Sequence, residues 1–248
     1  MRFVFILIVF FGVIKANTVE EIFFNANIFM KNNDYNNAVS LYESALELNQ
    51  EHADIYYNLG NAYYRLGFLG NAIWAYSKAI KLKPRDKDIQ YNLLLTKSQT
   101  IDRVELPDDF LILTKYREFK SMLTLEEYSF LSSIFLLILI LFNFFIKLVN
   151  IKLKIMDMIL NMLIIATLGI HGITLDRYLT KKTENKAVFI INSVKAFSAP
   201  SQNSGKNLFN INEGSICDIL INQESWSKIS LIDGKVGWVK NIDYRSLK

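Results

Sequence analysis

The stretch from Tyr56 to Ile80 decides the fold, and it reads YYNLGNAYYRLGFLGNAIWAYSKAI. Large and small residues recur in it at helical spacing up to Gly67, and the same spacing resumes at Ala72 and continues to Pro84. The interruption predicts a turn between two antiparallel helices. Small residues such as Ala72 allow these helices to approach closely, and the aromatic side chains fill the space between them.

The order of these residue types resembles one tetratricopeptide repeat, a helix pair with a period of about 34 residues. The pattern recurs one period earlier, so we expect two repeats, at residues 19–52 and 53–86. The first is less regular, because Asn25 and Ala26 replace Leu-Gly and Gln50 replaces Pro. Five pairs of residues match in register: Ile22 with Tyr56, Phe29 with Tyr63, Ala38 with Ala72, Tyr42 with Tyr76, and Ala45 with Ala79.

A third helical segment, residues 86–99, follows the second repeat. Its apolar residues form one stripe, and Asp86 or Asp88 is expected to cap its start. A repeat array needs a capping helix because its last helix pair leaves an apolar face open. We therefore expect an all-α tetratricopeptide-repeat array over residues 17–100.

The composition indicates a membrane protein. The chain has 248 residues, 51% of them hydrophobic, and a net charge of +4 at pH 7. No basic block with interleaved aromatic residues occurs, which argues against nucleic acid as a partner. The single cysteine, Cys217, excludes an internal disulfide, and its apolar surroundings predict a core residue rather than a reactive thiol.

The first apolar segment, residues 1–16, has a positive start at Arg2, an apolar run from Phe3 to Ile14 and a small residue at Ala16. These features predict a secretory signal peptide cleaved after Ala16, and an uncleaved N-terminal anchor is the alternative. Either version exports the residues that follow.

Two further apolar segments, residues 128–149 and 155–175, are each long enough to be transmembrane helices. The loop between them, residues 150–154, lies in the run KLVNIKLK, which holds Lys147, Lys152 and Lys154 and no acidic residue. By the positive-inside rule, this loop is expected in the cytoplasm. The chain then returns to the outer side.

Residues 101–127 and 176–185, which flank this hairpin, are expected to be linkers. Export by the N-terminal segment and an even number of spans predict one topology. The protein would lie in the bacterial inner membrane, with the repeats and the C-terminal domain facing the periplasm.

The C-terminal region, residues 186–248, changes from a helical period to a period of two. Turn signals at Glu213-Gly214 and Asp233-Gly234 separate about five short strands. So many short strands predict a small all-β barrel. The residues expected in its core are Phe209, Trp226, Trp238 and Val239.

The run SWSKISLIDGKVGWV at residues 225–239 resembles the end of bacterial SH3-like domains. Gly237 and Trp238 match the most regular part of that pattern. The resemblance implies an SH3-like barrel of a kind that often binds cell-wall peptides or other proteins.

The order of parts resembles the BatE family of aerotolerance proteins over essentially the whole chain. The residues that carry this resemblance are NLGNAYYRLGFLGNAIWAYSKAIKLKP at 58–84, TIDRVELPDDF at 100–110, the hairpin, and DGKVGWV at 233–239. The resemblance implies a membrane component encoded beside MoxR-type ATPases and von Willebrand factor A proteins. It also implies a role in oxidative-stress tolerance or envelope integrity.

The sequence contains no pattern that indicates an enzyme. Its two histidines, His52 and His171, are far apart, and no Cys/His cluster has the spacing of a metal site. Neither a phosphate-binding Gly-rich loop nor a G-x-S-x-G elbow occurs. We therefore expect no catalytic residue, no cofactor and no metal.

The candidate binding site is the concave groove of the repeats. The repeat family places positions two, five, six, nine, twelve and thirteen of each first helix in that groove. These positions include Phe23, Asn27, Met30 and Lys31 in the first repeat, and Tyr57, Asn58, Asn61, Tyr64 and Arg65 in the second.

Asn27 and Asn58 fall where carboxylate-clamp repeats hold the C-terminus of a peptide. However, Phe23 stands where that clamp has lysine, and Asn92 stands where it has arginine. A C-terminal carboxylate ligand is therefore disfavoured. An extended segment held by backbone hydrogen bonds and aromatic contacts fits the groove better.

Two functions fit these features. The first is a non-enzymatic membrane-anchored adaptor, whose partner the BatE resemblance suggests to be a von Willebrand factor A-type membrane protein. The second is a cell-wall sensor, in which the SH3-like domain binds peptidoglycan and the repeats act as a spacer. An oxidative-stress enzyme has only Cys217 as a candidate redox centre.

Overall fold

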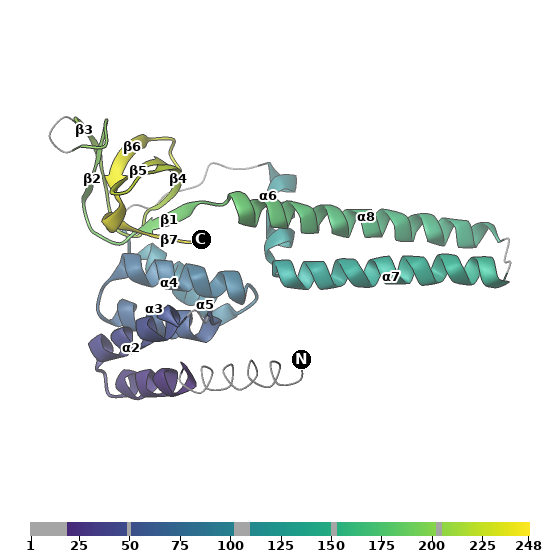
Figure 1. Ribbon diagram of the computed structural model, residues 1–248, viewed down its shortest axis with the longest axis horizontal. Helices are drawn as coiled ribbons and strands as arrows, with labels where there is room; N and C mark the ends of the chain where they lie inside the picture. Colours follow the sequence, from purple (N-terminus) through teal and green to yellow (C-terminus); the bar gives the residue numbers. More distant parts are fainter. Residues whose placement is uncertain (1–18, 49–50, 102–109, 150–152, 202–204) are drawn as a thin grey trace, which may run out of the picture. The chain divides into compact units, whose positions relative to one another are not determined.

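The computed structural model describes residues 19–48, 51–101, 110–149, 153–201 and 205–248 (Figure 1). They form two compact units. Unit 1 combines the chain up to Pro107 with Asn185–Lys248, and unit 2 is Asp108–Glu184. The predicted signal peptide, residues 1–16, lies outside the described residues.

The first part of unit 1 is a helical array. Its helices are α1 (residues 19–31), α2 (Tyr35–Glu47), α3 (Ala53–Arg65), α4 (Leu69–Leu82) and α5 (Lys87–Ser98). Asp34 caps α2, and Asp86 caps α5 by accepting from the N–H groups of Asp88 and Ile89. The turn between α3 and α4 contains Gly67 at φ +79°, a conformation that glycine adopts without a Cβ clash.

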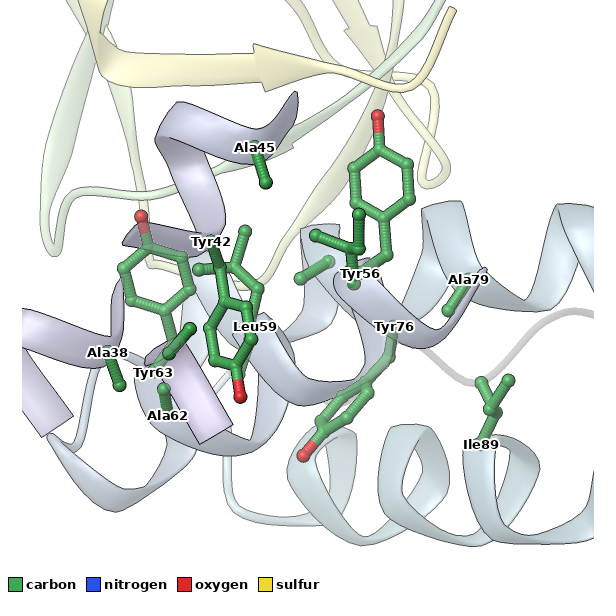
Figure 2. Packing of buried hydrophobic residues seen from close by; sticks show 14 of the residues in the cluster. Ala38, Tyr42, Ala45, Tyr56, Leu59, Ala62, Tyr63, Tyr76, Ala79 and Ile89 are labelled. Carbon is green, nitrogen blue, oxygen red and sulfur yellow. The ribbon is translucent and has the colours of Figure 1, made fainter. Parts of the chain in front are cut away.

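Small and aromatic side chains pack the array as the sequence predicts (Figure 2). Ala38, Ala72 and Leu59 are fully buried between the helices. Gly60 allows the closest approach, because a Cβ on it would lie 2.6 Å from the ring of Tyr76. The helix pairs therefore depend on the alternation of bulk and space along residues 56–80.

The second part of unit 1 is one seven-stranded antiparallel sheet with the strand order β3-β2-β6-β5-β4-β1-β7. Its strands are β1 (Lys186–Phe189), β2 (Val194–Phe197), β3 (Asn207–Ile211), β4 (Ile216–Asn222), β5 (Trp226–Leu231), β6 (Val236–Lys240) and β7 (Tyr244–Ser246), with a 3₁₀ turn, η1 (Asn241–Asp243), before β7.

The sheet differs from the predicted barrel in two ways. β3 and β7 are its edges and do not pair, so the SH3-like barrel is not closed. In addition, Val239 is buried, but its neighbour Trp238 is only half-buried, as are Trp226 and Phe209. The core prediction is confirmed for Val239, which is buried, and for Phe209, which packs against the buried cluster of the sheet. It is wrong for Trp226 and Trp238, which lie outside that cluster; Trp238 stands between the buried Gly237 and Val239 on β6 and so points to the other face.

The array and the sheet of unit 1 pack directly on each other. Ile73 of α4, Val188 of β1 and Leu247 form a buried cluster between them. The N–H of Gly70 donates to Glu213 Oε2 at 3.1 Å, and Trp74 Nε1 donates to the main-chain oxygen of Ser246 at 2.8 Å. The segments before and after unit 2 therefore share one buried interface.

Unit 2 consists of α6 (Leu111–Ser121), α7 (Leu125–Val149) and α8 (Lys154–Thr183). α7 and α8 run antiparallel, and with 25 and 30 residues both are long and apolar enough to cross a membrane. Thr124 and Glu127 form a capping box at the start of α7. The segments expected to be linkers are partly helical, since α6 lies within residues 101–127 and α8 continues to Thr183.

Candidate functional site

The candidate site is the face of the array lined by α1, α3 and α5. In Figure 2, the hydroxyl groups of Tyr42 and Tyr76 point to one side of the array, and those of Tyr56 and Tyr63 point to the other. Tyr42 and Tyr76 donate hydrogen bonds to asparagines of the groove, whereas the ring of Tyr63 lies against Arg245 of the sheet. The same helices thus present two different surfaces.

A hydrogen-bonded triad occupies the first half of the groove. Tyr42 of α2 donates its hydroxyl proton to Asn27 Oδ1 at 2.6 Å. Asn58 of α3 donates from Nδ2 to the same oxygen at 3.0 Å. Asn27 therefore accepts from two neighbouring helices and holds the Asn58 side chain in place.

The triad recurs 34 residues later, because 27, 42 and 58 become 61, 76 and 92. Tyr76 donates to Asn61 Oδ1 at 2.7 Å, and Asn92 Nδ2 donates to the same oxygen at 3.1 Å. Asn92 Nδ2 also donates to the hydroxyl of Tyr57 at 3.2 Å. Each tyrosine also packs on the aromatic ring of a groove residue, Phe23 on Tyr42 at 5.9 Å and Tyr57 on Tyr76 at 6.1 Å between centroids.

The asparagines of the two triads have different roles. Asn27 and Asn61 use their carbonyl oxygens within the protein, whereas Asn58 and Asn92 donate to them. Among the described residues, the Oδ1 atoms of Asn58 and Asn92 accept no hydrogen bond. Both side chains are half-buried and held through their Nδ2 groups, and Asn92 lines the pocket described next, so each keeps an amide oxygen that can accept from a ligand.

A pocket of about 410 Å³ opens beside the second triad. Tyr64 at its wall accepts a hydrogen bond from Gln99 Nε2 at 2.7 Å, and Thr96 donates to the main-chain oxygen of Asn92 at 2.7 Å. Its lining is mostly polar and neutral, with one charged residue, Arg65. The lining residues are Met30, Asn61, Tyr64, Arg65, Tyr76, Asn92, Leu95 and Thr96.

Most of the groove residues predicted from the sequence lie at the pocket or at the two triads. Asn61, Tyr64 and Arg65 line the pocket, together with Met30. Asn27, Asn58, Phe23 and Tyr57 belong to the triads or their ring contacts. Lys31 is exposed at the C-terminal end of α1. Sequence reasoning missed the hydroxyl groups of Tyr42 and Tyr76, although their 34-residue spacing matches that of Asn27 and Asn61.

The opposite face of the array is occupied by the C-terminal strand. Arg245 of β7 forms an ion pair with Glu43 of α2 at 2.7 Å. Its guanidinium also lies 4.6 Å from the ring centroid of Trp74 and 5.6 Å from that of Tyr63. Tyr63 donates its hydroxyl proton to the same Glu43, and burial together with this carboxylate raises the pKa of Tyr63.

Two lysines of α4 fasten the end of the chain. Lys78, which is 9% exposed, donates to the main-chain oxygen of Lys248 at 2.6 Å and to Glu51 at 3.1 Å. Lys81 donates to the main-chain oxygen of Leu247 at 2.9 Å. Residues 246–248 thus lie against α4 on this face of the array.

Titratable groups elsewhere give no sign of a reactive centre in the described part of the chain. Cys217 is buried in the sheet, where burial and Asp218 raise the pKa of its thiol to about 12. No group of three His, Cys, Asp or Glu side chains among the described residues is placed to hold a metal ion.

The comparison with known families identifies the repeats. A TPR repeat family matches residues 26–67, and the tetratricopeptide repeat family matches residues 53–86. The chain therefore contains tetratricopeptide repeats, a class of module that mediates protein–protein interactions. No curated protein matches the chain.

Proposed function

We propose that this protein is a non-enzymatic, membrane-anchored adaptor whose repeat groove holds an extended segment of a partner protein. The observation that carries the proposal is the repeated triad, which presents the amides of Asn58 and Asn92 one repeat apart. The repeats themselves support a role in protein–protein interaction.

The chemistry of the groove matches a peptide backbone. The free Oδ1 of a fixed asparagine accepts a hydrogen bond from a backbone N–H group. An extended segment exposes such groups at regular intervals, whereas a helical ligand uses its own N–H groups internally. The half-buried rings of Tyr57 and Tyr64 add apolar contact area beside the two amides.

The pocket beside Asn92 adds room for side chains of the partner. Its volume of about 410 Å³ lies in the range of small-ligand sites. Arg65 gives the pocket a positive charge, and the side chains of Leu95 and Met30 form an apolar part of its wall. A partner side chain with an apolar stem and a polar or anionic end fits such a lining.

Membrane anchoring by α7 and α8 is supported by their length and apolarity, and the interface within unit 1 bears on the topology. Residues 19–101 and 185–248 lie before and after the hairpin, yet they share one buried interface. Such an interface forms only when both segments are on the same side of a membrane. It therefore favours a hairpin in which both helices span or neither does.

The assembly and the compartment are proposed from the resemblance described above. As a member of a Bat-type membrane assembly, the protein would face the periplasm with unit 1 and bind a von Willebrand factor A-type membrane protein. Its role would lie in oxidative-stress tolerance or envelope integrity.

A recovery experiment tests the groove. Full-length protein is purified from detergent-solubilised membranes as wild type and as Tyr57→Ala, Asn58→Ala and Asn92→Ala variants. Asn36→Ala is a matched control, because Asn36 is exposed on α2 away from the groove. One hydrogen bond to a partner contributes about 1 kcal/mol, so each asparagine variant should bind about fivefold more weakly.

Tryptophan fluorescence shows whether each variant is folded, because all three tryptophans lie in unit 1, which also contains the groove. Folded groove variants that recover the same proteins in the same amounts as wild type and Asn36→Ala would show that the groove is not the partner site.

A second candidate, peptidoglycan binding, is favoured by aromatic side chains on the sheet. Phe197 and Trp226 are half-buried, and their rings lie 5.7 Å apart in an edge-on arrangement. Co-sedimentation of the detergent-solubilised full-length protein with wall sacculi tests this candidate. Binding that Trp226→Ala removes would support it, and absence of co-sedimentation would exclude it.

A further inference from the structure

Helix α6 leaves its apolar side chains exposed. None of its residues is buried. Leu111 is 72% exposed, Ile112 is 66% exposed, and Met122 just beyond the helix is 52% exposed. A short helix with this much exposed apolar surface requires a partner that the described residues do not supply.

Contacts fix α6 at one end of the hairpin. Tyr116 donates its hydroxyl proton to Asp176 of α8 at 2.6 Å, and Lys120 forms an ion pair with the same carboxylate at 2.6 Å. On the other helix, Tyr128 donates to the main-chain oxygen of Phe119 at 2.6 Å. In Figure 1, α6 crosses the ends of α7 and α8 instead of running along them.

These contacts place α6 at the level where the uncharged stretch of the hairpin begins. On α7, the charged residues end at Glu127, and no further charge occurs before Lys147. On α8, the uncharged stretch ends at Asp176. A helix that lies crosswise at this level is parallel to the plane of the membrane and at its surface.

Most of the large apolar residues of α6 lie on one side of the helix. With about 3.6 residues per turn, Leu111, Ile112, Phe119 and Met122 fall within about one third of the helix circumference. Arg117, Lys120 and Ser121 fall on the opposite side, together with Leu113, which is 48% exposed. Lys115 lies within the apolar third and forms an ion pair at 2.7 Å with Glu118, which lies at the edge of that third beside Leu111, so the charge of this lysine is neutralised within α6.

We infer that α6 is an interfacial helix, whose apolar side inserts into the boundary between the headgroups and acyl chains of the bilayer that α7 and α8 span. This inference rests on the proposed membrane anchoring. Its occupant is the phospholipid bilayer, because α6 is held at the end of two helices that are long and apolar enough to cross one. Amphipathic helices of this kind bury their apolar side about 5–10 Å into the interface.

Tyrosines support this placement. Tyr116, Tyr128 and Tyr178 lie at the same end of the hairpin, where aromatic residues with a polar tip are enriched in membrane proteins. α6 then has a mechanical consequence for the adaptor. It would hold the start of α7 at a fixed depth and limit tilting of the hairpin.

Site-directed spin labelling of the full-length protein in phospholipid nanodiscs tests the inference. Single cysteines replace Leu111 and Ile112 on the apolar side, and Arg117 and Ser121 serve as matched controls on the opposite side. Native Cys217 is 1% exposed, so we expect it not to take up the label in the folded protein. Collision of each label with oxygen, which partitions into lipid, is compared with collision with a water-soluble nickel chelate.

We expect the oxygen-to-nickel ratio to be several-fold higher at positions 111 and 112 than at 117 and 121. Equal, water-like ratios at all four positions would overturn the inference. Protection of positions 111 and 112 from both reagents would also overturn it, because protein would then cover this side.

A label at Leu137, which is 56% exposed in the middle of α7, separates failure of this inference from failure of membrane anchoring. A lipid-like ratio at 137 with water-like ratios at 111 and 112 refutes only the interfacial placement of α6. A water-like ratio at 137 refutes membrane anchoring and the inference together.

Discussion

Replacement of Gly70 by alanine should destabilise unit 1, although the same change in most helices is stabilising. Gly70 lies in the first turn of α4, directly under β1. A Cβ on it would lie 2.3 Å from the main-chain oxygen of Phe189 and 2.9 Å from the Cα of Ile190. Both neighbours are backbone atoms, so the clash is relieved only by moving α4 and β1 apart.

Two effects of opposite sign determine the magnitude. Gly→Ala in a helix gains about 0.5–1 kcal/mol from helix propensity. Overpacking of a buried contact costs about 1–3 kcal/mol, and separation of α4 from β1 also weakens the hydrogen bond from the Gly70 N–H to Glu213. The clash is the larger effect, so we expect a net loss of about 1–2 kcal/mol.

The assay is thermal unfolding of the full-length protein in detergent, followed by tryptophan fluorescence. Trp74, Trp226 and Trp238 are the three tryptophans of the chain, and all lie in unit 1. For a domain of this size, 1 kcal/mol shifts the midpoint by about 2–4 °C, so Gly70→Ala should lower it by about 2–8 °C.

Gly169→Ala is the matched control, because Gly169 is helical and a Cβ on it would meet no atom within 4 Å. It should leave the midpoint of unit 1 unchanged. A Gly70→Ala midpoint equal to or above that of wild type would refute the packing of α4 against β1.

Three other predictions follow from the fold. Gly214→Ala should lower the free energy of unfolding more than Gly234→Ala, as measured by urea unfolding. Both glycines have φ +83°, but only a Cβ at 214 would meet a side chain of the array, Thr100 Cγ2 at 2.6 Å. Unit 1 should lose stability above pH 10, by up to about 1.4 kcal/mol per pH unit for each buried tyrosine, as measured by urea midpoints between pH 9 and 11.5. Burial raises the pKa of Tyr42 and Tyr56 to about 12, so these tyrosines ionise at lower pH in the unfolded chain than in the folded protein. The stability present below pH 10 is therefore lost as the pH rises towards 12. A free energy of unfolding that stays constant over this range would contradict their burial. Cys217 should resist maleimide in the folded protein at pH 8 and react rapidly in urea, and rapid labelling without urea would contradict its place in the sheet.

The sequence is sufficient to predict the repeats, because equivalent small and aromatic residues of the 34-residue pattern pack in the same way in both repeats. Ala38 and Ala72 are at equivalent positions, and both are completely buried. The hairpin at Gly234 is equally predictable, since its positive φ requires a residue such as glycine. Local patterns of this kind depend on neighbours in the chain.

The packing of the sheet against the array is not predictable in this way. Gly70, Trp74 and Lys78 are spaced by four residues on α4 and resemble one more core stripe of the repeat. Their partners lie far along the chain, with Trp74 and Ser246 separated by 172 residues. Nothing in the local spacing of either segment specifies that pairing.

The groove is predictable in part. The family pattern identifies Asn27, Asn58 and Asn61 as groove residues, but it does not distinguish the supporting amides from those that face a ligand. That distinction depends on the hydroxyl groups of Tyr42 and Tyr76, which a sequence pattern identifies only as packing residues.

The central claim is that a partner segment binds across the groove of the repeats. Photo-crosslinking in intact cells tests it most directly, with p-benzoylphenylalanine in place of Tyr64 in the pocket wall and, as a control, in place of Asn36 on α2. We predict a crosslinked membrane protein at position 64 but not at 36, and loss of that product in the Asn58→Ala/Asn92→Ala double variant. Absence of a product at position 64, or a product that the double variant leaves unchanged, would contradict the claim.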